Sequence, residues 1–379
     1  MSRLVKKATK KSIVAVLLAI TMILTIILPV WAEEVKIPDI SQWAVGTLNE
    51  GERYGIYPLE WYYDNFRTEI SQERLEKLLA GTAIKIAELG IKEKEEVNPV
   101  PYKGDSTRGD IILRLYNILD KYDLPIGESP VDYMQERGIV KGTTNGLELD
   151  KICTTEDAVV LATRLIEDTY NLLQAGSKGL AWKLEHNGSV VYFLGSIHVG
   201  SNKLYPMDQR LKQAFNESDA LIVEANLFDQ QGGMDYFIEK STYQDGSTIK
   251  DNISEETYEK VLQVFEKYGM PEETFSQFKP WSLANSLNVV SLTNSENVQQ
   301  GAQSANLGID VYFLTNALLS QKPIYELEGI KYQADLFDGL STEFQENYLN
   351  AIVDNILNHP TDEIGVVDEV NDSAKLIEE

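Results

Sequence analysis

One histidine and one glutamate follow apolar runs at positions from which they could act together. Residues 189–194 have a strand pattern that leads into a short turn ending at His198, and a second apolar run over 220–223 ends at Glu224. The spacing of residues 206–215 predicts a crossover helix, which would make the two runs neighbouring parallel strands. Open α/β sheets place their sites beyond the carboxyl ends of such strands. His198 and Glu224 are therefore predicted to lie side by side, as a pair that binds a metal ion or transfers a proton.

Both residues also have a purely structural interpretation. A histidine between two glycines can cap a loop by hydrogen bonding, and Glu224 can be a helix N-cap partner or a surface carboxylate. Ser196 lies beside His198, but no separate base accompanies it, so a serine nucleophile is not expected.

The N-terminal 32 residues have the composition of a secretory signal peptide. Basic residues precede an uncharged apolar stretch over residues 13–30, which closes with Val30-Trp31-Ala32. This pattern predicts cleavage after Ala32. An uncleaved anchor is the alternative, because the apolar stretch approaches the length of a membrane span. Both alternatives place the remainder outside the cytoplasm, and cleavage would leave no stable membrane span.

The chain is strongly acidic, with 34 basic and 59 acidic residues and a formal net charge of -25. Such a surface repels nucleic acid at long range, so no nucleic-acid partner is expected. Cys153 is the only cysteine, which excludes an intrachain disulfide despite the oxidising compartment. The combination predicts a secreted or wall-associated protein of the Gram-positive type.

The length predicts two domains, because the part after the signal peptide exceeds what one hydrophobic core usually organises. Residues 33–174 have short helical patterns separated by turns, whereas strand and helix patterns alternate over 180–379. Residues 175–179 are predicted to be a linker. The expected fold is an α/β or α+β domain, with a mixed or parallel sheet and flanking helices, preceded by a small all-α module.

Three amphipathic helices of the N-terminal region are predicted to begin after hydroxyl caps, at Ser71, Thr107 and Thr154. The last two are followed three residues later by Asp110 and Asp157, where a capping box usually has Glu or Gln. These helices, together with residues 133–142, are similar to S-layer homology repeats.

In that family a Thr-Arg-Ala-Glu-like motif begins a helix, and its arginine helps to hold anionic, pyruvylated cell-wall polysaccharide. Arg108 matches this arginine, whereas Gln72 and Thr155 stand in its place in the other repeats. The resemblance implies a cell-wall polysaccharide partner bound through Arg108. A degenerate, structural copy of the repeat is the alternative.

The second region resembles the TraB/GumN family, which includes metal-dependent TIKI-type proteases, from Gly179 to the C-terminus. The resemblance is carried by a series of short segments in a fixed order, namely Leu180-Ala181-Trp182-Lys183, residues 195–200, Tyr205-Pro206, residues 218–224, Lys279-Pro280-Trp281, Gly308-Ile309-Asp310, and residues 322–328 with Gln333. It implies a metal-dependent hydrolase, with a peptidase as one candidate, acting on a peptide or another small substrate.

The candidate metal ligands are His198, Glu224, Glu328 and Asp310, and the first two are also the candidate catalytic residues. A catalytic metal site commonly takes about three protein ligands and leaves one position for water. A carboxylate-rich set with one histidine favours manganese or cobalt over zinc. Glu326 alternates with Glu328, so one of the two should face solvent, and Asp310 can instead be a favourable first-turn acid.

The family typically has a second Gly-x-x-His near its C-terminal end, and none follows residue 200 in this sequence. One explanation is that the sequence is a fragment, which favours the hydrolase. The other is natural loss of half the site, which favours a non-catalytic wall-associated or ligand-binding protein that retains the fold. His186, beside an Asn187-Gly188 turn, is expected to be exposed and inert, and His359, before a proline, is expected to end a helix.

Overall fold

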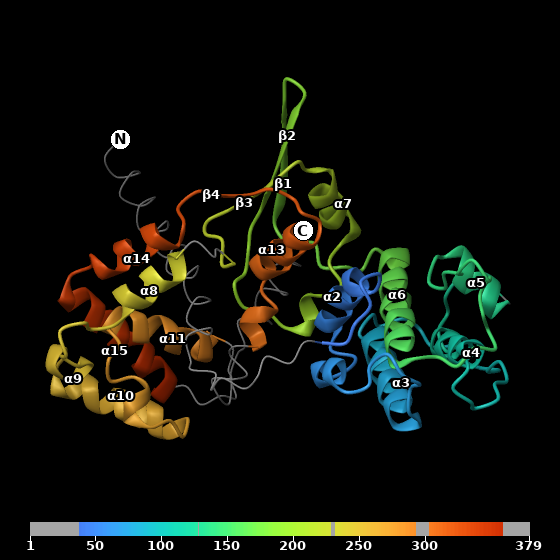
Figure 1. Cartoon of the computed structure of the whole chain (residues 1–379), viewed down its shortest axis with the longest axis horizontal. Helices are drawn as coiled ribbons and strands as arrows, with labels where there is room; N and C mark the ends of the chain where they lie inside the picture. Colours follow the sequence, from blue (N-terminus) through green and yellow to red (C-terminus); the bar gives the residue numbers. More distant parts are fainter. Residues whose placement is uncertain (1–37, 128, 229–231, 293–302, 359–379) are drawn as a thin grey trace. The chain divides into compact units, whose positions relative to one another are not determined.

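The computed structural model describes residues 38–127, 129–228, 232–292 and 303–358. The predicted signal peptide and His359 lie outside these residues. The chain divides into two compact units (Figure 1). Among the described residues, the N-terminal unit comprises those between 38 and 178 and Asn202–Gln213, and the C-terminal unit comprises Gly179–Ser201 and those between 214 and 358. Within the described ranges, no helix is long and apolar enough to cross a membrane.

The N-terminal unit is helical. Its elements are α2 (Val45–Tyr54), η2 (Leu59–Tyr63), α3 (Gln72–Ala87), α4 (Arg108–Leu119), α5 (Pro130–Glu136), α6 (Thr155–Leu173), η3 (Asn202–Leu204) and the first part of α7 (Gln209–Glu217). The three predicted caps are confirmed, because Ser71, Thr107 and Thr154 each accept a hydrogen bond from the backbone N–H three residues later. These bonds satisfy donors that the first turn of a helix otherwise leaves unpaired.

Helix α6 forms the centre of this unit, with α2 and α3 packed against it. The apolar positions predicted to share one face point inward. Leu75 and Leu78 of α3, Leu115 of α4, and Leu161 and Leu165 of α6 are almost completely buried. In this unit both the predicted helix starts and the predicted buried faces of the helices therefore agree with the structure.

The C-terminal unit consists mainly of helices joined by short strands. Its elements are β1 (Ala181–His186), β2 (Ser189–Leu194), β3 (Leu221–Val223), α8 (Gly233–Ser241), α9 (Ile249–Asn252), α10 (Glu255–Lys267), η4 (Glu272–Thr274), α11 (Pro280–Leu292), α13 (Ile309–Leu319), β4 (Ile324–Glu326), α14 (Ile330–Asp338) and α15 (Thr342–Asn358).

Two apolar clusters meet on α11. One joins α11 to α10 and α15 and includes Val261, Leu287 and Val353. The other surrounds Trp281, which is fully buried against Phe237 of α8 and Phe337 of α14. Helix α11 is therefore shared by both clusters. It packs against α8 and α10, which precede it in the chain, and against α14 and α15, which follow it.

The strands form two separate two-stranded sheets in the described part of the chain. β1 and β2 pair in an antiparallel hairpin whose turn residues, Asn187 and Gly188, both have positive φ, as the Asn-Gly pair predicts. β3 and β4 pair in parallel. The prediction that residues 189–194 and 220–223 are neighbouring parallel strands is wrong, because β2 pairs with β1 and β3 pairs with β4 in separate sheets. This unit is helix-rich with small sheets.

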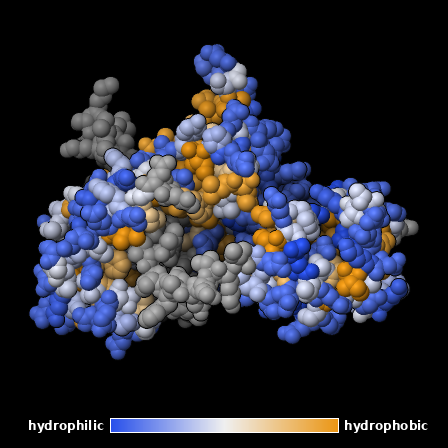
Figure 2. Space-filling model, viewed as in Figure 1, coloured by the Kyte–Doolittle hydropathy of each residue, from blue (hydrophilic) through white to orange (hydrophobic). Residues whose placement is uncertain are grey.

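One face of the hairpin is apolar and uncovered within the described residues. Trp182 pairs with Phe193 and Leu184 pairs with Val191, and all four side chains are substantially exposed. Figure 2 shows apolar surface on the hairpin below its hydrophilic tip. A two-stranded hairpin on its own is only marginally stable in water.

Candidate functional site

His198 lies in the loop that follows β2 in the C-terminal unit. Three backbone hydrogen bonds hold this loop: Gly195 N–H donates to Leu180 O, Ile309 N–H to Ile197 O, and Gly200 N–H to Ser304 O, each at 2.8 Å. The loop is therefore tied to the start of α13 and not to a neighbouring parallel strand.

This contact brings His198 to Asp310, in the first turn of α13. The His198 Nδ1 atom lies 2.7 Å from Asp310 Oδ2, and the two side chains are 14% and 21% exposed. Burial lowers the pKa of His198, but the hydrogen bond to Asp310 and the negative charges of Asp310 and Glu224 outweigh it, so the net pKa is raised. An aspartate at Nδ1 fixes the ring orientation and leaves Nε2 as the nitrogen that can act.

Glu224 and Glu328 lie together at the carboxyl ends of β3 and β4. The backbone carbonyl of Glu224 accepts hydrogen bonds from the N–H groups of Glu328 (3.0 Å) and Gly329 (2.9 Å). Partial burial raises the pKa of the Glu224 carboxyl, His198 lowers it, and Asp310 and Glu328 raise it, with a net rise. The four residues singled out in the sequence thus interact electrostatically at one place.

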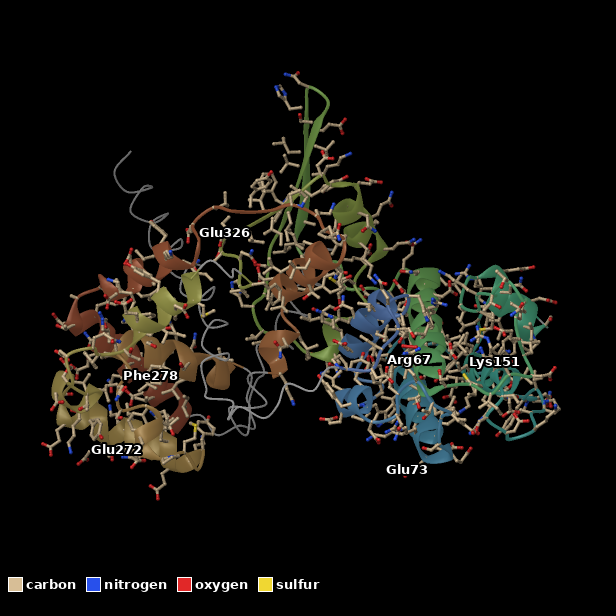
Figure 3. The ribbon with its side chains drawn as sticks, in the orientation of Figure 1. Arg67, Glu73, Lys151, Glu272, Phe278 and Glu326 are labelled. Carbon is tan, nitrogen blue, oxygen red and sulfur yellow. The ribbon has the colours of Figure 1, made fainter. Side chains whose placement is uncertain are left out.

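The alternation of Glu326 and Glu328 is resolved. Glu326 is exposed at the end of β4, where Figure 3 labels it, and its Oε1 accepts a hydrogen bond from Asn226 N–H at 2.6 Å. Glu328 is partly buried, and its Oε2 accepts from Gln333 Nε2 at 3.2 Å. Gln333 is almost completely buried, and the sequence patterns identified it only as part of a motif. Its spacing of five residues after Glu328, on the first turn of a helix, is the signal that could have revealed the contact.

The fit of this site to a metal ion depends on the number of ligands that converge. Among residues 38–127, 129–228, 232–292 and 303–358, no group of three His, Cys, Asp or Glu side chains is arranged to hold a metal ion. His198 Nδ1 lies against Asp310 Oδ2, so these two side chains pair with each other instead of acting as two converging ligands. The described residues therefore do not by themselves form a three-ligand metal site, whereas they do form an acid–base cluster.

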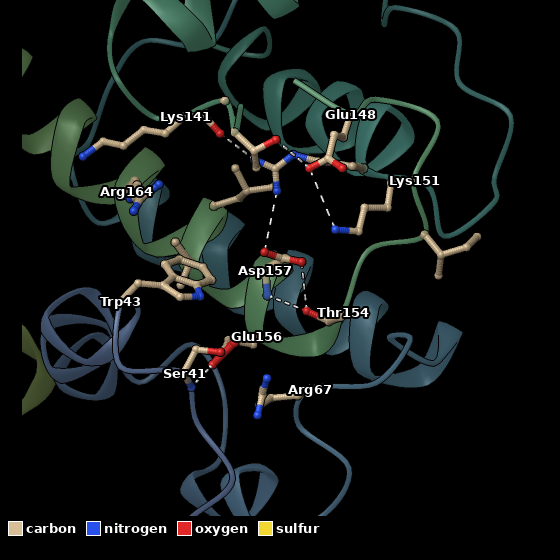
Figure 4. A pocket seen from close by; sticks show the side chains of 16 residues that line it. Ser41, Trp43, Arg67, Lys141, Glu148, Lys151, Thr154, Glu156, Asp157 and Arg164 are labelled. Carbon is tan, nitrogen blue, oxygen red and sulfur yellow. Dashed lines mark hydrogen bonds and ion pairs between the residues drawn. The ribbon is translucent and has the colours of Figure 1, made fainter. Parts of the chain in front are cut away.

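Arg108, the predicted wall-binding residue, lies far from this cluster in the chain and borders a cavity of about 620 Å³ in the N-terminal unit (Figure 4). Five basic and three acidic residues line it, together with the exposed Trp43. The charged residues are Arg67, Arg108, Lys141, Lys151, Arg164, Glu148, Glu156 and Asp157. Basic side chains thus outnumber acidic ones at this place on a strongly acidic protein.

Arg108 is held in place by its own unit. Its Nε donates to Leu147 O and its Nη2 to Lys141 O, both at 3.1 Å, and its Nη1 lies 3.7 Å from Asp157 Oδ1. Burial lowers the pKa of Arg164 and the charge of Arg108 lowers it further, while Glu167 and Asp157 raise it, with a net decrease. The guanidinium groups of Arg108 and Arg164 both line the cavity and repel each other. An anionic ligand in the cavity would reduce this repulsion.

The comparison with known proteins bears on the C-terminal unit. The sequence profile of the TraB/PrgY/gumN family matches residues 180–371, which is about half of the chain. The chain belongs to the TraB/PrgY/gumN family. All four clustered residues, His198, Glu224, Asp310 and Glu328, fall within the matched region.

Two curated relatives of this family member are the uncharacterized protein YbaP of Escherichia coli (strain K12) and that of Shigella flexneri. Each is 28% identical over 142 residues, which cover 38% of this chain and 49% of the relative. The chain thus spans about half the length of the curated relatives that it matches. No solved structure matches it.

Proposed function

We propose that the C-terminal unit is a hydrolase that acts through His198 and Glu224 on a peptide or another small substrate. The observation that carries this proposal is the 2.7 Å contact between His198 Nδ1 and Asp310 Oδ2, beside a carboxyl group whose pKa is raised. A histidine oriented by a carboxylate next to a protonatable glutamate is a pair suited to acid–base chemistry.

The two side chains supply the two proton transfers that hydrolysis needs. The Glu224 carboxylate removes a proton from a water molecule, whose oxygen then forms the new bond to the substrate carbonyl carbon. As the bond to the leaving group breaks, the protonated His198 donates its Nε2 proton to that group. Asp310 stabilises the positive charge on His198 while the ring holds the proton.

A divalent metal ion, manganese or cobalt in preference to zinc, is the cofactor that the family resemblance implies. Such an ion would lower the pKa of a bound water. Since the described residues do not form a three-ligand set, an ion at His198 and Glu224 would be held weakly by these residues alone. Calorimetry with Mn²⁺ and Co²⁺ tests this: we expect weak binding that is lost in His198→Gln and Glu224→Gln. Tight binding that survives both substitutions would remove the two residues from any metal site.

Activity is tested by following cleavage of a mixed peptide library by mass spectrometry. His198→Gln and Glu224→Gln should each reduce cleavage by about 10²- to 10⁴-fold, the usual contribution of a general acid or base. The matched control is His186→Gln, because His186 lies at the exposed end of β1. Equal cleavage by His198→Gln and the control would reject the assignment.

A second candidate function belongs to the N-terminal unit, where we propose that the cavity beside Arg108 binds anionic cell-wall polysaccharide. The excess of basic residues and the exposed Trp43 support this, since aromatic faces pack on sugar rings and guanidinium groups bind carboxylates. Asp157 partly neutralises Arg108, so the binding should be weak.

A pull-down on pyruvylated wall polysaccharide tests the second candidate. Arg108→Ala should reduce the fraction of the protein that the polysaccharide retains. Arg137→Ala is the control, because Arg137 belongs to the same unit but pairs with Asp168 outside the cavity. Strong binding that is unaffected by Arg108→Ala would place the contact surface elsewhere.

We also propose that the protein is exported, with cleavage after Ala32. Mass spectrometry of secreted material should find Glu33 at the N-terminus. Recovery of the protein only in membranes, with residues 1–32 retained, would support a tethered form instead.

A further inference from the structure

Alternate residues of β2 point their backbone groups away from β1. Directly after the paired strands, Gly195 N–H donates to Leu180 O at 2.8 Å. Hydrogen-bonded pairs recur at every second residue of an antiparallel ladder, so this bond fixes which residues of β2 bond to β1 and which do not. The N–H and C=O groups of Val190, Tyr192 and Leu194 belong to the second set. We call these groups the free edge of β2.

The free edge of β2 has no strand beside it in the described part of the chain. There β2 pairs with β1 alone, and no other backbone hydrogen bond uses the free edge. Unpaired backbone groups along a strand are a template for another extended chain, which adds to the sheet through main-chain hydrogen bonds. The free edge of β2 therefore offers a peptide a row of donors and acceptors.

The side chains beside this edge suit a peptide with apolar residues at alternate positions. Trp182 and Phe193 lie on one side of the hairpin together with Leu184 and Val191, and the two aromatic side chains are 59% and 54% exposed. Every residue of β1 is exposed, so no described element buries this side of the hairpin. A strand added to β2 would place every second side chain on the same side, where it would extend the apolar row.

The strand that carries the free edge leads to the candidate catalytic residues. His198 is the fourth residue after Leu194, the last residue of β2. The turn between them is held by the bond from Ile309 N–H to Ile197 O, and His198 pairs there with Asp310. A peptide that lies along β2 and continues past its carboxyl end is therefore directed toward the proposed site.

We propose that an extended peptide with apolar side chains at every second position binds as an added strand along the free edge of β2. This inference rests on the proposed hydrolase for its catalytic meaning, and it names how the substrate lies. The strand-like segment holds the peptide, and the bond to be cleaved lies beyond that segment, at His198 and Glu224. A peptide is favoured over a second copy of the chain as the occupant, because a net charge of -25 makes two copies repel each other.

Fluorescence anisotropy of a labelled, uncharged peptide of alternating valine and threonine tests the proposal. The protein is the full chain with Glu224→Gln, which leaves the peptide intact under the proposed mechanism. Two further peptides carry backbone N-methyl groups, one at every valine and the other at every threonine. The N–H groups of successive residues in a strand point to opposite edges, so only one of the two peptides loses its bonds to β2. We expect that peptide to bind at least about tenfold more weakly and the other to bind like the parent.

Substitutions in the hairpin locate the peptide on the protein. Tyr192→Pro removes one N–H group of the free edge and should weaken binding about three- to tenfold. Lys183→Pro is the matched control, because Lys183 pairs with Tyr192 and its N–H group points to the opposite edge of the hairpin. Trp182→Ser should also weaken binding, whereas Phe344→Ser, at an exposed apolar position on α15, should not.

Several results would overturn the proposal. Equal binding of the two N-methylated peptides, or no binding of the parent, would show that no strand is added. Weaker binding in Lys183→Pro with unchanged binding in Tyr192→Pro would place the peptide on β1. Sedimentation that finds a dimer of the unliganded protein, dissociated by Trp182→Ser, would assign the apolar side to a second copy. If a proline variant fails to fold, the N-methylated peptides still give the comparison with an unaltered hairpin.

Binding and cleavage fail separately. Binding along the free edge without cleavage of any peptide by the unsubstituted protein would reject the hydrolase and leave the strand site standing. Cleavage that Tyr192→Pro and Trp182→Ser leave unchanged would reject the strand site and leave the hydrolase standing.

Discussion

The two units place their apolar side chains differently. In the N-terminal unit the apolar faces of α3, α4 and α6 meet and are covered, so that residues such as Leu78 and Leu165 have no exposed surface. In the C-terminal unit the helices bury Trp281 completely, whereas the hairpin leaves Trp182 59% exposed. The same type of residue, tryptophan, is thus buried in one element of this unit and exposed in another.

The difference shows which elements carry the stability of each unit. In the N-terminal unit, amphipathic helices that begin at side-chain caps bury their apolar faces against neighbouring helices. This burial is the main source of the unit's stability. A two-stranded hairpin needs further strands or a packed helix to be stable in water, and in the described residues β1 and β2 pair only with each other. Stability in the C-terminal unit should therefore reside in its helices.

The largest expected effect is on the buried tryptophan. Trp281→Ala should lower the free energy of unfolding of the C-terminal unit by about 3–5 kcal/mol, because it opens a cavity between Phe237 and Phe337. Trp182→Ala should change it by no more than about 0.5 kcal/mol. Urea denaturation of both variants measures the contrast, and similar losses would mean that the hairpin face is covered.

Trp281→Phe sharpens this test. The phenyl ring keeps much of the packing, and the indole N–H that it removes is buried without a hydrogen-bond partner in the part of the chain described. The loss should therefore be well below that of Trp281→Ala. A loss as large as that of Trp281→Ala would show that the N–H group has a partner.

The next effect concerns a side chain that organises the loop before α4. Asp110 is buried, and its Oδ1 accepts hydrogen bonds from the N–H groups of Lys103 (2.6 Å) and Gly104 (3.1 Å). Asp110→Ala should cost about 1–3 kcal/mol of unfolding free energy, while Asp110→Asn retains the accepting oxygen and should cost less. Equal losses in the two variants would show that the charge, not the acceptor, matters.

Helix capping in the N-terminal unit should give a smaller loss. Thr154→Ala removes the acceptor for Asp157 N–H at 3.0 Å and should cost about 1 kcal/mol, and Thr154→Ser should be close to neutral. Thermal unfolding of the two variants checks this. If Thr154→Ala leaves stability unchanged, local capping does not contribute to the N-terminal unit in the way that its sequence suggests.

The smallest effect is a dependence on pH in the C-terminal unit. Hydrogen bonds from Ser254 and Thr257 lower the pKa of Glu346, against partial burial that raises it. A carboxyl group with a lowered pKa stabilises the folded state above its unfolded pKa, and this contribution is lost as the pH falls through the folded pKa. Stability measured from pH 5 downward (about the unfolded pKa of a glutamate) should therefore decline less steeply in Glu346→Gln. The exposed Glu259→Gln is the control and should retain the slope of the unchanged protein.

Much of the local structure could be predicted from the sequence. The caps at Ser71, Thr107 and Thr154, and the Asn187-Gly188 hairpin, depend on groups within a few residues of each other, so local chemistry is sufficient. Glu224 and Glu328 both belong to the candidate ligand set predicted from the sequence, and the parallel pairing of β3 with β4 brings them together.

Only the tertiary structure decided how the candidate site is assembled. His198 reaches Asp310 through a loop held on α13 by the hydrogen bond from Ile309 N–H to Ile197 O, not through a parallel sheet. The cavity beside Arg108 likewise depends on segments far apart in the sequence. Short-range patterns carry no information about such contacts, since their free energy arises only when distant segments pack together.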